Sequence, residues 1–240
     1  MAAAWIVPFL AGTVAAIFAA RVWGQWVVQK RASNLAWALG LSLYALAALL
    51  ESLAAARGWT FATYATYLVA ASANVGAMGA GTLYLARGRR AVAHVFAFFV
   101  VVAALVVLAA PFLAPPEFAG AGTDLGLDGL GPGGPHLAGR IAFIALSALG
   151  GVALIGGALW SSWQTRRLGV LLIGLGALVV ASGGSIAALA ARAPAQALAQ
   201  APTTDIRLAT QAIGIFVMFI GYLRGRDALP PAQARAPANG

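Results

Sequence analysis

Most of this sequence is too apolar to do chemistry, and one carboxylate stands out for that reason. Glu51 lies inside a long apolar stretch, six residues before Arg57, which is about 9 Å along a helix. An acid at membrane depth costs free energy unless it is protonated or paired. We interpret Glu51 either as a proton- or cation-coupling group or as half of a structural ion pair. The partners expected near the same end of the helices are Arg57, Arg140, Arg192 and Arg207.

Hydroxyl and amide side chains form a second candidate group, in the third and seventh apolar stretches. Tyr67 and Asn74 are seven residues apart, so they share one side of a helix. Thr210 and Gln211 lie in the seventh stretch. Such groups face other helices or a wet cavity rather than lipid. We predict either interhelical hydrogen bonds or the lining of a path for a small solute. The polar stripe of the third stretch also includes Thr60, Thr63 and Tyr64.

Other kinds of reactive site find no support in the sequence. It has no cysteine, and its two histidines, His94 and His136, are predicted at opposite membrane faces. Nucleophile-elbow, zinc-protease and P-loop motifs are absent. The single lysine, Lys30, lies in a loop, which excludes a retinal Schiff base in the last helix. We therefore predict no catalytic residue, no metal and no cofactor.

The elements that carry these side chains are membrane-spanning helices. The chain of 240 residues is 62% hydrophobic and 9% charged, against about 45–50% and 25% in soluble domains. These values exclude a soluble enzyme, a disordered chain and a nucleic-acid-binding module. We predict an all-α polytopic membrane protein, a seven-transmembrane-helix bundle in one domain over 1–240. Each segment is near the ~20 residues of a membrane span. The segments are 2–22, 35–56, 61–86, 91–113, 141–160, 168–191 and 206–223.

Charge and tryptophan patterns predict the orientation of this bundle. Eleven of the 15 Lys and Arg residues follow the first, third, fifth and seventh segments. Cytoplasmic loops carry such an excess, so we expect the N-terminus outside and the C-terminus inside the cytoplasmic membrane. The seven tryptophans lie near predicted helix ends, where indole rings meet the headgroups.

Two halves of the chain match at a constant offset of 137 residues. Trp23 and Trp26 match Trp160 and Trp163, and Asn74 matches Gln211. One interpretation is a 3+1+3 parallel repeat. Its units would be 1–90 and 140–227, with a linker helix at 91–113, a flexible outer loop at 114–139 and a disordered tail at 228–240. The other interpretation is that Trp and Arg simply accumulate wherever helices reach the inner face.

The layout of three helices, one linker helix and three helices, with the N-terminus outside, resembles that of the SWEET and PQ-loop sugar transporters. In that family an asparagine of each third helix helps to line the solute site. The resemblance implies this role for Asn74 and Gln211. The prolines that bend the first two helices of each family unit have no counterpart here except Pro8.

Glycines repeat every seven residues in the last two segments, at Gly169, Gly176 and Gly183 and at Gly214 and Gly221. Such faces let helices approach closely. They could serve packing within the chain, a homo-oligomer or a membrane-protein partner. Two functions follow from the sequence: a translocator of a small solute, or a non-catalytic subunit or assembly partner of a larger membrane complex. The bilayer itself is the one partner expected in both cases.

Overall fold

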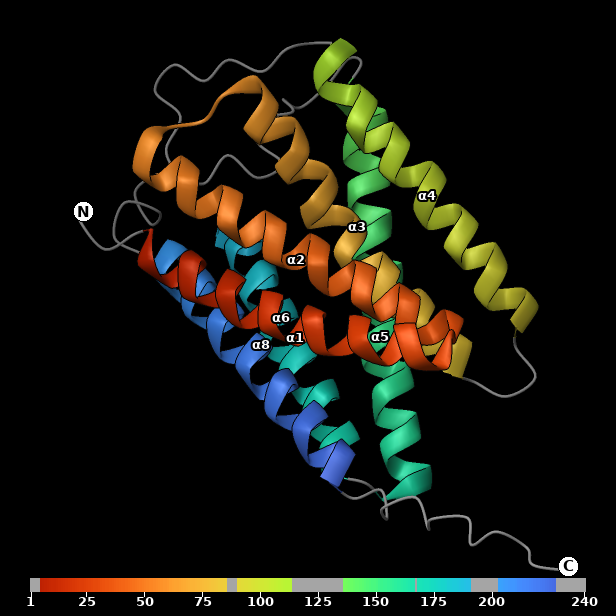
Figure 1. Ribbon diagram of the computed structural model, residues 1–240. Coiled ribbons are helices and arrows are strands. Elements are labelled where there is room, and N and C mark those ends of the chain that lie inside the picture. The colour runs from red at the N-terminus through yellow and green to blue at the C-terminus, as the bar shows by residue number, and fades with distance from the viewer. Residues whose placement is uncertain (1–4, 86–89, 114–135, 167, 191–202, 228–240) are drawn as a thin grey trace, which may run out of the picture.

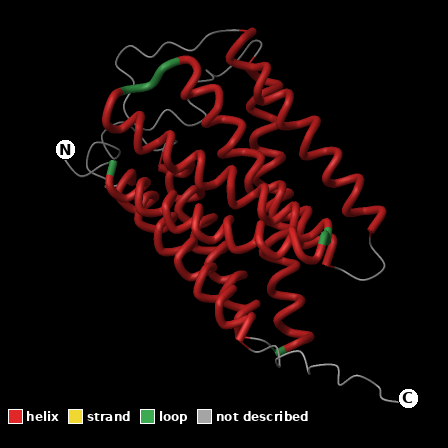
Figure 2. Tube along the Cα trace, viewed as in Figure 1, coloured by secondary structure: helices red, strands yellow, loops and turns green. Residues whose placement is uncertain are grey.

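The protein is all-helical in its computed structural model, which describes residues 5–85, 90–113, 136–166, 168–190 and 203–227. Within these ranges the chain forms helices joined by short turns, and no strand (Figure 2). The helices in chain order are α1 (Ile6–Gln29), α2 (Ala32–Arg57), α3 (Phe61–Leu85), α4 (Arg90–Leu113), α5 (His136–Thr165), α6 (Leu168–Ala190) and α8 (Thr203–Asp227).

Each predicted apolar segment is a helix in the structure. Six of the seven described helices are long and apolar enough to cross a membrane. The remaining one, α6, has a shorter apolar part, Leu168–Ser182, within the residues searched. Helices suit these segments because every backbone polar group is satisfied within the helix itself. A multi-pass membrane protein is therefore the class that the fold supports.

Several helices extend beyond the segments predicted for them, including α2 and α8 by three or four residues at one or both ends. α1 continues to Gln29 rather than ending near residue 22, and α5 begins at His136 and ends at Thr165. Residues 136–139 are thus helical and not part of a flexible loop. The hydropathy pattern missed these residues because polar or charged side chains interrupt the second end of α1 and both ends of α5. The rest of the predicted loop and the predicted tail lie outside the described residues.

Six of the helices pack in a closed order. Each of them contacts two neighbours, in the order α1, α2, α3, α5, α6, α8 and back to α1. We call this arrangement the ring. α4 lies outside it and packs on α3 and α5, along one side of the bundle (Figure 1). In this order α2 and α8 are separated by α1.

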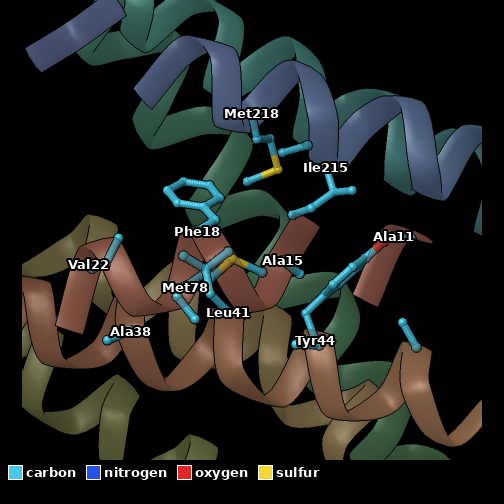
Figure 3. Packing of buried hydrophobic residues seen from close by; sticks show 14 of the residues in the cluster. Ala11, Ala15, Phe18, Val22, Ala38, Leu41, Tyr44, Met78, Ile215 and Met218 are labelled. Carbon is cyan, nitrogen blue, oxygen red and sulfur yellow. The ribbon is translucent and has the colours of Figure 1, made fainter. Parts of the chain in front are cut away.

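Apolar side chains from all six ring helices meet in one buried cluster (Figure 3). We call its central members the apolar layer: Phe18, Leu41, Met78, Leu154, Ala177, Ile215 and Met218. Phe18 also stacks on α8, with its ring centroid 5.4 Å from that of Phe219 and 4.9 Å from that of Tyr222. The layer therefore closes the interior of the ring at this depth.

Glycines set the closest helix contacts of the ring. A Cβ atom at Gly40 of α2 would lie 2.8 Å from the backbone oxygen of Asn74 on α3. A Cβ atom at Gly176 of α6 would lie 2.5 Å from the backbone oxygen of Gly214 on α8. Gly221 makes a similar approach to the backbone of α6. The repeated glycines of α6 and α8 thus pack against each other within the chain, as one of the sequence interpretations predicts.

Candidate functional site

Two polar contacts join α2 to α8 across the interior of the ring. The guanidinium of Arg207 donates to the carboxylate of Glu51 in a short salt bridge. One turn further along α8, the backbone carbonyl of Gln211 accepts a hydrogen bond from the hydroxyl of Tyr44 at 3.2 Å. We call these four residues the polar cluster. They link two helices that are not neighbours in the ring.

Helix geometry explains why these side chains converge. Tyr44 and Glu51 are seven residues apart on α2, and Arg207 and Gln211 are four apart on α8, so each pair lies on one face of its helix. Ser52 anchors the same end of α2 by donating from its hydroxyl to the backbone carbonyl of Trp5, at 2.9 Å. This contact fixes the last turns of α2, which carry Glu51, against the start of α1.

The charged pair is almost completely removed from solvent. The side chain of Glu51 is 7% exposed and that of Arg207 is 12% exposed. Taking an ion out of water costs several kcal/mol, and an opposite charge in contact offsets that cost. The contact between the two charges therefore offsets part of the cost of burying each of them.

The polar cluster reaches from the apolar layer toward one end of the ring. Tyr44 belongs to the same buried cluster as Leu41, which is three residues away on α2, whereas Glu51 is ten residues beyond Leu41. At about 1.5 Å per residue, Glu51 is roughly 15 Å from Leu41 along the helix. The charged pair therefore lies nearer the end of the ring than the other two members of the polar cluster.

Asn74 lies on the face of α3 that also carries Met78 of the apolar layer, one turn away. Its side-chain nitrogen donates to the backbone carbonyls of Ala70 and Ala71, both at 3.0 Å. Its side-chain oxygen is buried without a hydrogen-bond partner among the described residues. No side-chain hydrogen bond therefore joins Asn74 to Gln211, the two residues that the sequence alignment placed together.

The other residues of the polar stripe make separate local contacts along α3. Thr60 and Thr63 hydrogen-bond to each other at the start of the helix. Tyr64 is fully buried against α4 and α5, and the ring of Tyr67 stacks on Trp59 at a centroid distance of 5.0 Å. Thr210 of α8 donates to the backbone carbonyls of Ile206 and Arg207 on its own helix. These groups serve caps, packing and local hydrogen bonds.

Sequence reasoning identified Glu51 and named Arg207 among four partners, and the structure selects Arg207. It also identified Gln211, although the contact uses the backbone oxygen rather than the amide. It missed Tyr44. The available signal was the spacing of seven residues between Tyr44 and Glu51, which places a hydroxyl on the face of the only carboxylate within that segment.

Neither histidine nor acidic residues gather into a metal site within the described ranges, where no group of three or more His, Cys, Asp or Glu is found. His94 instead contacts the hydroxyl of Tyr84 at 2.9 Å, linking α3 to α4. No family model, curated protein or solved structure matches the chain. The polar cluster and Asn74 are thus the features from which a function can be argued.

Proposed function

We propose that the protein is a translocator of a small polar solute across the cytoplasmic membrane. Asn74 carries the proposal. A buried acceptor without a donor costs about 1–3 kcal/mol, and a membrane helix gains nothing from keeping one for packing alone. A solute that donates a hydrogen bond to this oxygen during passage would satisfy the acceptor and remove that cost. The position of Asn74 beside the apolar layer, where passage must be controlled, supports this assignment.

We further propose that the ring consists of two parallel three-helix units, α1–α3 and α5–α8, with α4 as the linker. Similar local geometry in the two halves supports duplication. The ring centroids of Trp23 and Trp26 are 5.4 Å apart, and those of Trp160 and Trp163 are 5.5 Å apart. Each first helix ends at a residue with φ of 51°, Lys30 in one half and Arg166 in the other.

The close helix contacts suggest a register for this duplication. Gly40 meets the backbone and side chain of α3 in the way that Gly176 meets those of α8. The matched pairs are Gly40 and Gly176, Met78 and Met218, and Asn74 and Gly214. The offset is 137 residues for the tryptophans of the first helix, 136 for the end of that helix and for the second helix, and 140 for the third helix. In this register Asn74 has no amide counterpart, so Gln211 is assigned to the polar cluster and not to a paired solute site.

The two units have the same orientation only if the linker between them crosses the membrane as well. We therefore propose seven spans, with α6 as the span whose apolar part is short, and with the C-terminus in the cytoplasm. The basic residues that follow α1, α3, α5 and α8 support this orientation.

Solute entry into proteoliposomes tests the function without knowledge of the natural solute. Vesicles containing the protein should swell faster than empty vesicles in at least one of glycerol, urea, erythritol, glucose and alanine, measured by stopped-flow light scattering. Asn74→Ala should slow that entry about tenfold, the value of one hydrogen bond. Thr13→Ala is the matched control, because Thr13 also bonds to its own helix but is exposed. Equal rates for empty and protein-containing vesicles would reject the proposal.

A second function, that of a non-catalytic subunit or assembly partner, is favoured by the placement of α4. This helix lies outside the ring, packs on α3 and α5, and exposes large apolar side chains such as Val95 and Phe98. Isolation in mild detergent followed by mass spectrometry should recover a stoichiometric membrane partner if this function holds. A translocator should instead be recovered alone or with copies of itself, and remain active.

A further inference from the structure

We propose that each of the two tight turns, α1–α2 and α5–α6, binds the headgroup of an anionic phospholipid such as phosphatidylglycerol. Both turns consist of basic residues: Lys30 and Arg31 follow α1, and Arg166 and Arg167 follow α5 in the sequence. The inference is independent of translocation, because it concerns the surface of the bundle and not its interior. It requires that both turns lie at the same end of the bundle.

Contacts between helices place both turns at that end (Figure 1). A Cβ atom at Gly81, near the end of α3, would lie 3.2 Å from the backbone oxygen of Ser33 in the first turn of α2. Gly157, in the second half of α5, meets the side chain of Thr82 on α3. The end of α3 thus lies beside the start of α2 and the last turns of α5. In the orientation proposed above, this end faces the cytoplasmic leaflet, which carries anionic lipids.

The backbone of the two turns is the first observation that points to a ligand. Lys30 and Arg166 both have a φ of 51°. Each closes its helix with a backbone N–H, which donates to the carbonyl of Trp26 at 2.8 Å and of Ser162 at 2.7 Å. Glycine is the usual residue in this left-handed conformation, which a Cβ atom disfavours. The other positive φ in the described part of the chain is indeed that of Gly58, after α2. A cation therefore replaces glycine twice, both times at this end of the bundle.

Interactions within the protein do not account for these cations. A basic side chain anywhere in the last turn would interact favourably with the helix dipole, without a left-handed backbone. No salt bridge joins Lys30, Arg31 or Arg166 to an acidic side chain that the structure describes. All three residues are exposed. Their charges are therefore available to an anion from outside the chain.

Aromatic rings hold the first turn at the level of lipid headgroups. The ammonium nitrogen of Lys30 lies 4.2 Å from the centroid of the Trp26 ring, a cation–π contact that fixes its position. Trp23 meets Trp26 edge-on and donates its indole N–H to the hydroxyl of Ser42 on α2, at 3.0 Å. Indole rings concentrate where the bilayer meets water. The Lys30 ammonium thus lies where a phospholipid carries its phosphate.

Exposed apolar side chains next to the cations favour a lipid over a soluble anion. Val28, two residues before Lys30, is 83% exposed, and Leu168, two residues after Arg166, is 68% exposed. Trp163 of the second turn's aromatic pair is 74% exposed. The basic groups can bond to phosphate oxygens, while these side chains contact the acyl chains of the same molecule. A soluble phosphate would use the cations and leave the apolar surface uncovered.

Native mass spectrometry of the detergent-purified full chain tests the inference. The probes are phosphatidylglycerol and phosphatidylcholine with identical acyl chains, added in increasing amounts. Two molecules of phosphatidylglycerol should bind about thirtyfold more tightly than phosphatidylcholine, the value of two basic residues in each turn. Equal affinities for the two lipids would overturn the inference.

Glycine variants separate lipid binding from a role at the helix ends. Lys30→Gly and Arg166→Gly remove a charge and supply the residue that the backbone favours. Each should lower the affinity for phosphatidylglycerol at its turn about fivefold, while the unfolding temperature in neutral detergent stays the same or rises. If both variants keep the wild-type affinity, the basic residues serve only the helix ends and the inference is wrong.

Arg57→Gly is the matched control, because Arg57 is an exposed basic residue next to Gly58 and follows no second cation at the other end of α2. It should keep the wild-type affinity for phosphatidylglycerol. An equal loss in this variant would show that binding follows net charge rather than the two turns, and would reject the sites.

Glycerol 3-phosphate separates a lipid from a soluble phosphate, since it carries a phosphate without acyl chains. In molar excess it should leave phosphatidylglycerol bound. Displacement of the lipid by glycerol 3-phosphate would assign the turns to a soluble anion and overturn the proposed lipid.

Discussion

Replacing Arg207 with methionine should lower the free energy of unfolding by about 3–5 kcal/mol, because it removes the positive charge that contacts the buried carboxylate of Glu51. The substitution keeps an unbranched side chain of moderate length, so lost packing contributes less than lost charge. The effect should appear in a titration with sodium dodecyl sulfate, followed by circular dichroism. The variant should unfold at a lower mole fraction of the denaturing detergent than the wild type.

Two further variants separate the charge from the side chain. Glu51→Gln combined with Arg207→Met removes both charges and should recover most of the lost stability, since replacing a whole buried pair is often close to neutral. Arg21→Met is the matched control, because Arg21 is exposed on α1, and it should change stability by less than about 0.5 kcal/mol. A double variant as unstable as Arg207→Met would show that the contact is held by packing and not by charge.

The sequence predicted the helices well because the membrane restricts the alternatives. Long apolar stretches in a membrane favour helices, and each of the seven predicted segments corresponds to one described helix. The ends of the helices were predicted less well, because a helix continues for several residues beyond the end of its apolar run. The last turn of α1, Val27 to Gln29, and the start of α5 at His136 are both helical although polar residues lie in or next to them.

Side-chain partners were harder to predict than helices. The sequence placed Glu51 near four arginines, and the choice of Arg207 depends on the order of helices in the ring, which no local pattern contains. Asn74 and Gln211 share an alignment position but not a contact, because the third helix of the second unit is shifted by a few residues in the register proposed here. A long-range contact such as that of Tyr44 with Gln211 follows from packing between segments 167 residues apart.

Close approach of α6 and α8 should make Gly176 intolerant of any side chain. A Cβ atom there would lie 2.5 Å from the oxygen of Gly214 and 2.8 Å from the nitrogen of Met218. Both are backbone atoms, so the helices must separate rather than let a side chain rotate away. Gly176→Val should therefore cost about 3 kcal/mol or more, the upper part of the range for overpacking, measured by the same detergent titration.

Gly151→Val supplies the control for this prediction. Gly151 is also in a long helix, α5, but a Cβ atom there meets nothing within 4 Å. Replacing it should leave stability unchanged or raise it slightly, because glycine is the weaker helix former by a few tenths of a kcal/mol or more. Since α8 also carries Arg207 and Gln211, separation of α6 from α8 should also disturb the polar cluster in Gly176→Val but not in Gly151→Val. Equal stability of the two variants would contradict the prediction, because it would show that α6 and α8 can accommodate a side chain at position 176.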